Sequence, residues 1–367
     1  MANELTLLCL GLSPWEDPVT SSMILRQARE RGWRVSEVRH LPAPEPQTPD
    51  LLKEELGRPG RILLLSAKEH LPLASRILSD LSGQALRLTP SGILAPAGAE
   101  ELDGQGYTLT LKSGRVTFLE YRPHRLPSSL PLEELPARSW HCFYSRPEEE
   151  EAWNDLLSRL PAGVETAPLL PGWSRLRACG EAEIAALTRV LKASDLKRIL
   201  PLDSPEEALI RYLSYEGRSL TFAESCTGGR LAAAITSRSG SSAILEGSYV
   251  TYANRIKEEW LGVRLETLER YGAVSEECVR EMAAGAQGAL GAHIALAVSG
   301  IAGPTGAVPG KPVGTVWFCL RNGQREVTAR QRFFGDRNAV QEQAVLYGLK
   351  MIFESEEKIF HFFAKSS

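Results

Sequence analysis

Three side chains that can act as nucleophiles or ligands stand together in the stretch AESCTGG, residues 223–229. A predicted strand precedes this stretch and a helix-forming run, RLAAAI, follows it, so it turns into the N-terminal end of a helix. Backbone amides at such a turn can hold a phosphate or stabilise an oxyanion, and glycine lets the backbone approach a ligand. The candidate residues are therefore Ser225, Cys226, Thr227, Gly228 and Gly229.

The same stretch also fits a simple strand-to-helix turn in which the hydroxyl groups serve only as helix caps. It is not a GxSxG nucleophile elbow, and it is not a Walker loop because no GK[ST] follows. The motif by itself leaves the site and the plain turn equally open.

A serine nucleophile needs a base, and no histidine nearby belongs to a supporting pattern. A lysine can serve, because burial lowers its ordinary pKa of about 10.4. Lys257 follows the predicted strand 247–252 by one helical turn, and the loops after parallel strands meet at one sheet edge. Ser225 and Lys257 can therefore meet there, with Tyr252 and Asn254 beside them; the alternative is an ordinary solvated lysine.

Two further segments are expected at this edge. The loop SGIAGPTGAVPGKPVGT, residues 299–315, follows a buried strand and is rich in glycine, which suits a substrate-holding loop; a long surface loop is the alternative. In the stretch FFGDRNA, residues 333–339, Asp336 is expected to be a helix N-cap, and the guanidinium of Arg337 is a candidate for binding a phosphate group. The candidate residues of the loop are Ser299, Gly300, Ala302, Gly303 and Thr305.

The elements that must position these residues alternate between strand and helix. In the C-terminal part, a helix begins at Ser204 with a capping box to Glu207. Strands follow at 219–224, 247–252 and 293–300, then a hairpin over 314–334 with its turn at Asn322 and Gly323, and helices at 230–238, 254–262, 275–290 and 337–353.

The N-terminal part predicts a parallel α/β sheet and then a small α+β unit. Its strands are expected at 5–12, 33–41 and 61–66, its helices at 20–31, 48–57 and 70–83, and a hairpin at 107–120. A connector over 121–137 leads to strands at 139–145 and 173–180 and helices at 147–160 and 181–199.

Composition limits the classes of function. The 367 residues suggest two or three domains, and the net charge of −3 with no basic cluster argues against a nucleic-acid partner. Six scattered cysteines and no long apolar run indicate a reducing cytoplasm and no membrane segment. The dispersed histidines and cysteines predict no metal site.

The ordered segments AESCTGG, GSSAILEGSYVTYANRIKEEWLGV, YGAVSEECVREMA, AVSGIAGPTG, KPVGTVW and FFGDRNAV closely resemble the C-terminal domain of the CinA family of competence/damage-inducible proteins. The resemblance covers about 160 residues, from roughly 204 to 354. It implies an α/β/α amidohydrolase domain over 204–367 that converts nicotinamide mononucleotide to nicotinic acid mononucleotide and ammonia, in pyridine nucleotide salvage. The family's serine nucleophile falls on Ser225, its lysine base on Lys257 and its tyrosine on Tyr252, and no cofactor is implied.

Full-length members of this family carry a molybdopterin-binding-like domain and a KH-like module, which here correspond to 1–137 and 138–203. The family's glycine-rich loop and paired aspartates are absent: the matching places read GLSPWEDPVTSS (11–22) and LLLSAKEHLPLAS (63–75). We therefore expect a degenerate N-terminal domain, and ADP-ribose hydrolysis by a 1–140 fragment would refute this.

Three alternatives and two expectations remain from the sequence. The N-terminal half could act as a nucleotide pyrophosphatase, or the chain could be a non-enzymatic scaffold in competence or the DNA-damage response. Cys226 could be the nucleophile instead of Ser225, since a helix N-terminus can lower a thiol pKa. We expect a small nucleotide as substrate and a homodimer.

Overall fold

The structure, a computed structural model, describes residues 3–11, 18–102, 105–121 and 130–364. The chain divides into two compact units, which are described separately. The first comprises residues 1–137 with 179–184, and the second comprises 138–178 with 185–367.

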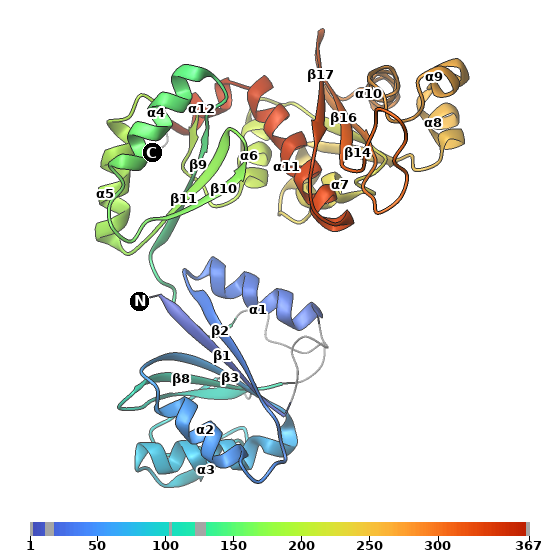
Figure 1. The fold of residues 1–367 in the computed structure, drawn as a ribbon. Coiled ribbons are helices and arrows are strands. Elements are labelled where there is room, and N and C mark those ends of the chain that lie inside the picture. The colour runs from blue at the N-terminus through green and yellow to red at the C-terminus, as the bar shows by residue number, and fades with distance from the viewer. Residues whose placement is uncertain (1–2, 12–17, 103–104, 122–129, 365–367) are drawn as a thin grey trace. The chain divides into compact units, whose positions relative to one another are not determined.

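The first unit is built on a six-stranded sheet in the order β2-β1-β3-β8-β7-β6. The strands β1, β2, β3 and β8 run parallel, whereas β7 pairs antiparallel with both β8 and β6. Figure 1 shows α1 on one face of this sheet and α2 and α3 on the other. The bounds are β1 Glu4–Leu10, α1 Pro18–Glu30, β2 Arg34–Leu41, α2 Thr48–Gly57, β3 Gly60–Ser66, α3 Leu71–Ser82, β6 Glu100–Leu102, β7 Gly106–Thr110 and β8 Gly114–Glu120.

The predicted parallel α/β start and the 107–120 hairpin are confirmed. Sequence reasoning missed β6 and the small sheet of β4 (Leu86–Leu88) and β5 (Leu94–Pro96), because three-residue strands carry too little periodicity. Residues 12–17 of the departing stretch 11–22 and residues 122–129 of the predicted connector 121–137 lie outside the described residues. His70, in the second departing stretch, packs against Gly11 at the end of β1, because a side chain added at Gly11 would lie 2.2 Å from the His70 ring.

The second unit begins with a four-stranded sheet in the order β10-β11-β9-β12, accompanied by α4 and α5. Strand β10 was not predicted, and the expected helix over 181–199 ends at Lys192, before β12. The bounds are β9 Ala137–Phe143, α4 Pro147–Ser158, β10 Glu165–Leu170, β11 Trp173–Cys179, α5 Glu181–Lys192 and β12 Ile199–Leu200.

The remainder of this unit is a five-stranded sheet in the order β14-β13-β15-β16-β17. Strands β14, β13 and β15 run parallel, and β16 and β17 add an antiparallel hairpin. The strand bounds are β13 Leu220–Glu224, β14 Leu245–Val250, β15 Ile294–Gly300, β16 Thr315–Asn322 and β17 Arg325–Arg332. The helix bounds are α6 Pro205–Tyr215, α7 Arg230–Thr236, α8 Asn254–Leu261, α9 Leu265–Arg270, α10 Glu276–Leu290, α11 Arg337–Ser355 and α12 Lys358–Ala364.

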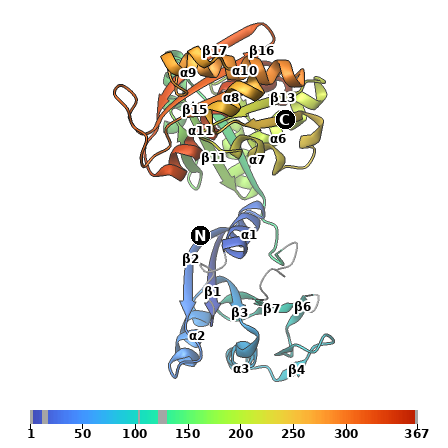
Figure 2. The same ribbon diagram turned by 90° about the vertical axis from the view of Figure 1, so that its right-hand side faces the viewer.

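Helices cover both faces of this sheet, which makes three α/β/α layers (Figure 2). Successive residues of β13 point to opposite layers: Phe222 packs with α6, α7 and α11, and Ala223 packs with α10. The three-layer fold expected for 204–367 is therefore confirmed, although α9 and α12 were missed. As expected, Ser204 is the N-cap of α6 and accepts from the Glu207 amide at 3.2 Å.

The two sheets of the second unit share one hydrophobic core. The Phe143 ring stacks on Trp173 with centroids 4.8 Å apart and lies 5.1 Å from the ring of Phe353 in α11. Residues 138–203 and 204–367 therefore pack as one compact body, and their division into two domains stays a prediction.

Candidate active site

Ser225 and Lys257 meet at the carboxyl edge of the five-stranded sheet. Ser225 directly follows β13, and Lys257 lies on α8, which begins four residues after β14. Because β13 and β14 run parallel, both segments leave the sheet at the same edge. The ammonium nitrogen Nζ of Lys257 lies 3.1 Å from the hydroxyl oxygen Oγ of Ser225, so the structure brings together the pair predicted from topology.

Lys257 is a buried cation with no acidic partner among the salt bridges of the described residues. Its side chain is 1% exposed, and Nζ donates to the carbonyl oxygens of Thr251 at 2.6 Å and Tyr252 at 3.3 Å. Burial lowers the pKa of this ammonium below its ordinary value of 10.5, while the thiols of Cys278 and Cys226 oppose the shift. The lysine is therefore easier to deprotonate than a solvated one, which excludes the alternative of a surface lysine.

The turn after Ser225 depends on two glycines with left-handed backbone conformations. Gly228 has φ 60° and Gly229 has φ 91°, a region that residues with a side chain rarely occupy. A side chain at Gly228 would meet nothing within 4 Å, and one at Gly229 would meet only Val250 at 3.5 Å. The glycines are therefore required for the shape of the turn and not for close approach to another part of the chain.

The buried carboxylate of Glu224, which sequence reasoning did not single out, organises this turn. Its oxygens accept from the amides of Gly229 at 3.0 Å, Leu231 at 3.1 Å and Ala232 at 3.0 Å. From the sequence, the amides of 227–229 are expected to form an oxyanion hole, but two of them are already paired: the Gly229 amide donates to Glu224, and that of Gly228 donates to the carbonyl of Ser225.

Three donors of the turn remain open. Within residues 130–364, all of which the structure describes, the amides of Cys226 and Thr227 have no acceptor. The hydroxyl of Thr227 is buried and also has no partner in this described segment. Such unpaired buried groups are costly and need an explanation, for which a ligand is one candidate.

Cys226 is poorly suited to act as a nucleophile. Its side chain belongs to the core beneath the sheet edge, and burial raises the pKa of its thiol to about 12. Its backbone carbonyl accepts a hydrogen bond from the side-chain amide of Gln341 at 2.7 Å. The thiolate is therefore scarce at neutral pH, and the arrangement favours Ser225.

Arg337 links two loops of the site. It occupies the first turn of α11, after the N-cap Asp336, which accepts from the Ala339 amide at 2.8 Å. Its guanidinium donates to the carbonyl of Gly303 and to the Tyr252 hydroxyl, both at 2.8 Å. Tyr252 and Arg337 are exposed, so both can also reach a ligand.

The remaining predicted residues divide between core and surface. Ser299 is fully buried and its hydroxyl donates to the carbonyl of Ala273 at 2.7 Å, so this hydroxyl braces the loop before α10. Ala302 packs in the core, and Gly300 ends β15 against Val316. The side chains of Asn254 and Thr305 are exposed and make no hydrogen bond within the described segment 130–364.

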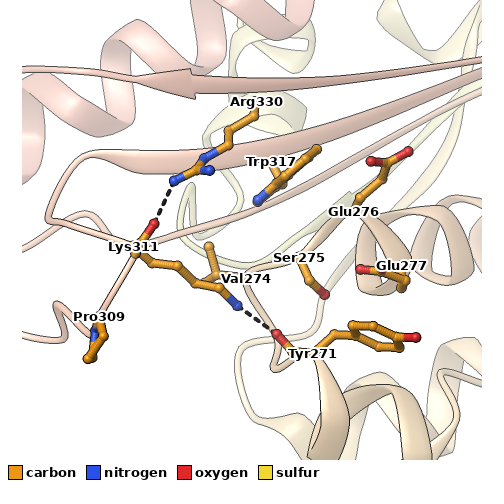
Figure 3. Close-up of a pocket in the computed structure, with 10 residues that line it drawn as sticks. Tyr271, Val274, Ser275, Glu276, Glu277, Pro309, Lys311, Trp317 and Arg330 are labelled. Carbon is orange, nitrogen blue, oxygen red and sulfur yellow. Dashed lines mark hydrogen bonds between the residues drawn. The ribbon is translucent and has the colours of Figure 1, made fainter.

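A hollow of about 280 Å³ is lined in part by residues 309–311 of the 299–315 loop (Figure 3). Lys311 donates from its side chain to the carbonyl of Tyr271 at 2.6 Å, and Arg330 donates to the carbonyl of Gly310 at 2.7 Å. Neither Ser225 nor Lys257 lines this hollow.

Among the described residues, no helix is both long and apolar enough to span a bilayer. The same residues hold no cluster of three or more histidine, cysteine or acidic side chains placed to bind a metal ion.

The fold and the site together define an α/β/α domain with a buried Ser/Lys pair at the carboxyl edge of its sheet. The profile of the CinA C-terminal domain matches residues 202–355. The nicotinamide-nucleotide amidohydrolase PncC of Enterobacter agglomerans is 53% identical over 139 residues, which are 38% of this chain and 85% of the relative. The protein of that name in Escherichia coli (strain K12) is 50% identical, over 39% of this chain and 87% of the relative.

Similarity also reaches beyond the C-terminal domain. A CinA-like protein of Thermotoga neapolitana is 43% identical over 296 residues, which cover 75% of this chain and 71% of the relative. A crystal structure of the competence damage-inducible protein A from Klebsiella pneumoniae is 42% identical, covers 41% of this chain and 96% of that one, and has a TM-score of 0.40. The chain belongs to the CinA family.

Proposed function

We propose that this chain is a nicotinamide-nucleotide amidohydrolase, which converts nicotinamide mononucleotide to nicotinic acid mononucleotide and ammonia in pyridine nucleotide salvage. The curated relatives that bear this name are about half identical to the C-terminal domain and are covered over most of their length. The observation that carries the mechanism is the 3.1 Å contact between Lys257 Nζ and Ser225 Oγ in a buried setting.

The reaction begins when Ser225 Oγ attacks the carboxamide carbon. In the neutral form of Lys257, two N–H groups donate to the carbonyls of Thr251 and Tyr252. The remaining lone pair is then directed at Ser225 and takes the hydroxyl proton as the C–O bond forms. The two carbonyls thus select the orientation in which lysine acts as a base.

The negative charge that develops on the carboxamide oxygen needs donors that are already in place. The amides of Cys226 and Thr227 and the Thr227 hydroxyl supply three such donors, because none of them has a partner within the described segment 130–364. These groups form the proposed oxyanion hole.

The tetrahedral intermediate collapses when its C–N bond breaks. The Lys257 ammonium returns its proton to the departing amine, which leaves as ammonia. A water molecule then attacks the acyl ester with Lys257 again as base, and the products are the nucleotide carboxylate and free Ser225. These steps require only proton transfers and one water molecule.

The phosphate end of the substrate is assigned to Arg337. Its guanidinium is exposed and already held by Gly303 and Tyr252, and a planar guanidinium suits a phosphate group. The glycine-rich segment 300–306 lies beside it through the contact with Gly303. We assign this activity to the cytoplasm; all six cysteines are free thiols, which fits a reducing compartment.

The test is ammonia release from nicotinamide mononucleotide by the full chain and by the variants Ser225→Ala, Lys257→Ala and Lys257→Arg. Each variant should lose about 100- to 10,000-fold in kcat, because loss of a nucleophile or a proton-transfer group removes that much rate. Arginine keeps the charge but cannot deprotonate, so it separates a base from a mere cation. Full activity in any of the three, with the fold intact by circular dichroism, would overturn the assignment.

A further inference from the structure

A buried carboxylate stands directly before the proposed nucleophile and is not used in the mechanism above. Glu224 is 0% exposed and makes no salt bridge within the described segment 130–364. A carboxylate in such a place is unfavourable unless hydrogen bonds satisfy its oxygens. Here the amides of Gly229, Leu231 and Ala232 and the hydroxyl of Ser248 do so.

These bonds join the turn before α7 to strand β14 and to the segment that follows β14. The carboxylate holds the first turn of α7 and, through the Ser248 hydroxyl at 3.2 Å, strand β14. The carbonyl of Glu224 accepts from the amide of Thr251 at 2.8 Å. The carbonyl of Thr251 in turn accepts a hydrogen bond from Lys257 Nζ at 2.6 Å. One residue therefore fixes the turn that bears Ser225 and the segment that orients Lys257.

The carboxylate also determines which amides stay open. It takes the Gly229, Leu231 and Ala232 amides, and the turn it holds leaves those of Cys226 and Thr227 unpaired. A neutral side chain of the same shape cannot do this, because an amide NH₂ group would face a backbone N–H where an oxygen now stands.

We propose that Glu224 is a positioning residue: it holds Ser225 and the open amides of the turn in the geometry that the transition state requires, without touching the substrate. This inference rests on the proposed amidohydrolase function. Misplacing a reacting group by about 1 Å costs about 100-fold in rate, so Glu224→Gln should lower kcat by about this factor.

The kinetic test compares Glu224→Gln with the matched control Glu258→Gln, which removes an exposed carboxylate beside Lys257. We expect Glu224→Gln to lower kcat with little change in KM and to leave the acidic limb of the pH–rate profile in place, since Lys257 is unchanged. The control should match the unaltered chain. Unchanged kcat, a loss confined to KM, or a shifted acidic limb would overturn the proposal.

Hydrogen–deuterium exchange gives a readout that does not need activity. In Glu224→Gln the amides of 229–232 should exchange faster, while those of α10 should not. If the unaltered chain releases no ammonia, the proposed function fails. The exchange pattern alone then decides whether Glu224 holds the turn. Equal exchange in both chains would refute that role of Glu224. If Glu224→Gln does not fold, Ser248→Ala replaces it. We then expect a smaller fall in kcat at constant KM. An unchanged kcat would contradict the proposal.

Discussion

At the scale of single residues, the chemistry depends on how burial changes two side chains in opposite directions. Burial lowers the pKa of Lys257 and raises that of Cys226 to about 12, because in both cases it disfavours the charged form. A larger share of the lysine is therefore neutral and able to accept a proton, whereas the thiol is a poorer nucleophile because less of it is thiolate. The same physical effect therefore assigns the proposed roles within one small site.

The first residue-scale prediction concerns pH. Only neutral Lys257 can accept the serine proton, so kcat/KM should fall as pH drops through the pKa of this lysine. That midpoint should lie below 10.5, the ordinary lysine value. The measurement is ammonia release across the pH range. A midpoint at or above the ordinary value would contradict the lysine as a buried base.

The second residue-scale prediction concerns Cys226. Since its thiol is buried and protonated, Cys226→Ala should keep kcat within about threefold, and the enzyme should resist thiol-blocking reagents. Ser225→Ala provides the comparison, because it should be inactive in the same assay. Loss of activity in Cys226→Ala with Ser225→Ala still active would reverse the two roles.

At the scale of elements, three segments converge on the site: the turn before α7, the segment between β14 and α8, and the loop after β15. The parallel strands bring them to one edge, and individual contacts then fasten them together. Arg337 ties the loop to Tyr252, and Ser299 ties the end of β15 to the segment before α10. The site is thus assembled from loops that a rigid sheet aligns.

The element-scale prediction follows from Arg337. Its removal should raise KM for nicotinamide mononucleotide by about 10- to 100-fold with a smaller effect on kcat, because a hydrogen bond to a charged group contributes about 1.5–3 kcal/mol. The control is Arg332→Ala, which removes another exposed arginine at the end of β17. An unchanged KM in Arg337→Ala would place the phosphate elsewhere.

At the scale of the whole molecule, residues 138–203 are part of the body that carries the site. Phe143 and Trp173 lie in the same core as Phe353 and Phe360. The ion pair of Arg198 with Glu149 and its contact with Glu354 at 3.6 Å add a polar connection. The proposed enzymatic part therefore has a core that begins well before residue 204.

The whole-molecule prediction tests this shared core. Trp173→Ala should destabilise the second unit by about 3–5 kcal/mol, as expected for a large buried aromatic side chain. Because Trp173 lies outside 204–367, the temperature at which ammonia release is lost should fall as well. Trp260→Ala, which removes an indole that is 55% exposed, should change neither. An unaltered inactivation temperature in Trp173→Ala would mean that the two parts fold independently.

Much of the fold was predictable because its elements carry strong local patterns. The buried strands of β13 and β15 and the capped start of α6 are apparent from residues close together in the chain. Short elements such as β4, β5 and α9 were missed, because so few residues show no clear period and their formation depends on tertiary packing.

The order of the strands, read from the sequence, was enough to predict that Ser225 and Lys257 could meet at one sheet edge. Parallel strands must place the loops that follow them on one side of the sheet, so Ser225 and Lys257 could be paired without coordinates. Which hydrogen-bonding groups around them lack a partner became visible only in the folded chain. It shows Glu224 taking the Gly229 amide and Ser299 turned to Ala273, because hydrogen-bond partners depend on distances between segments that no local pattern encodes.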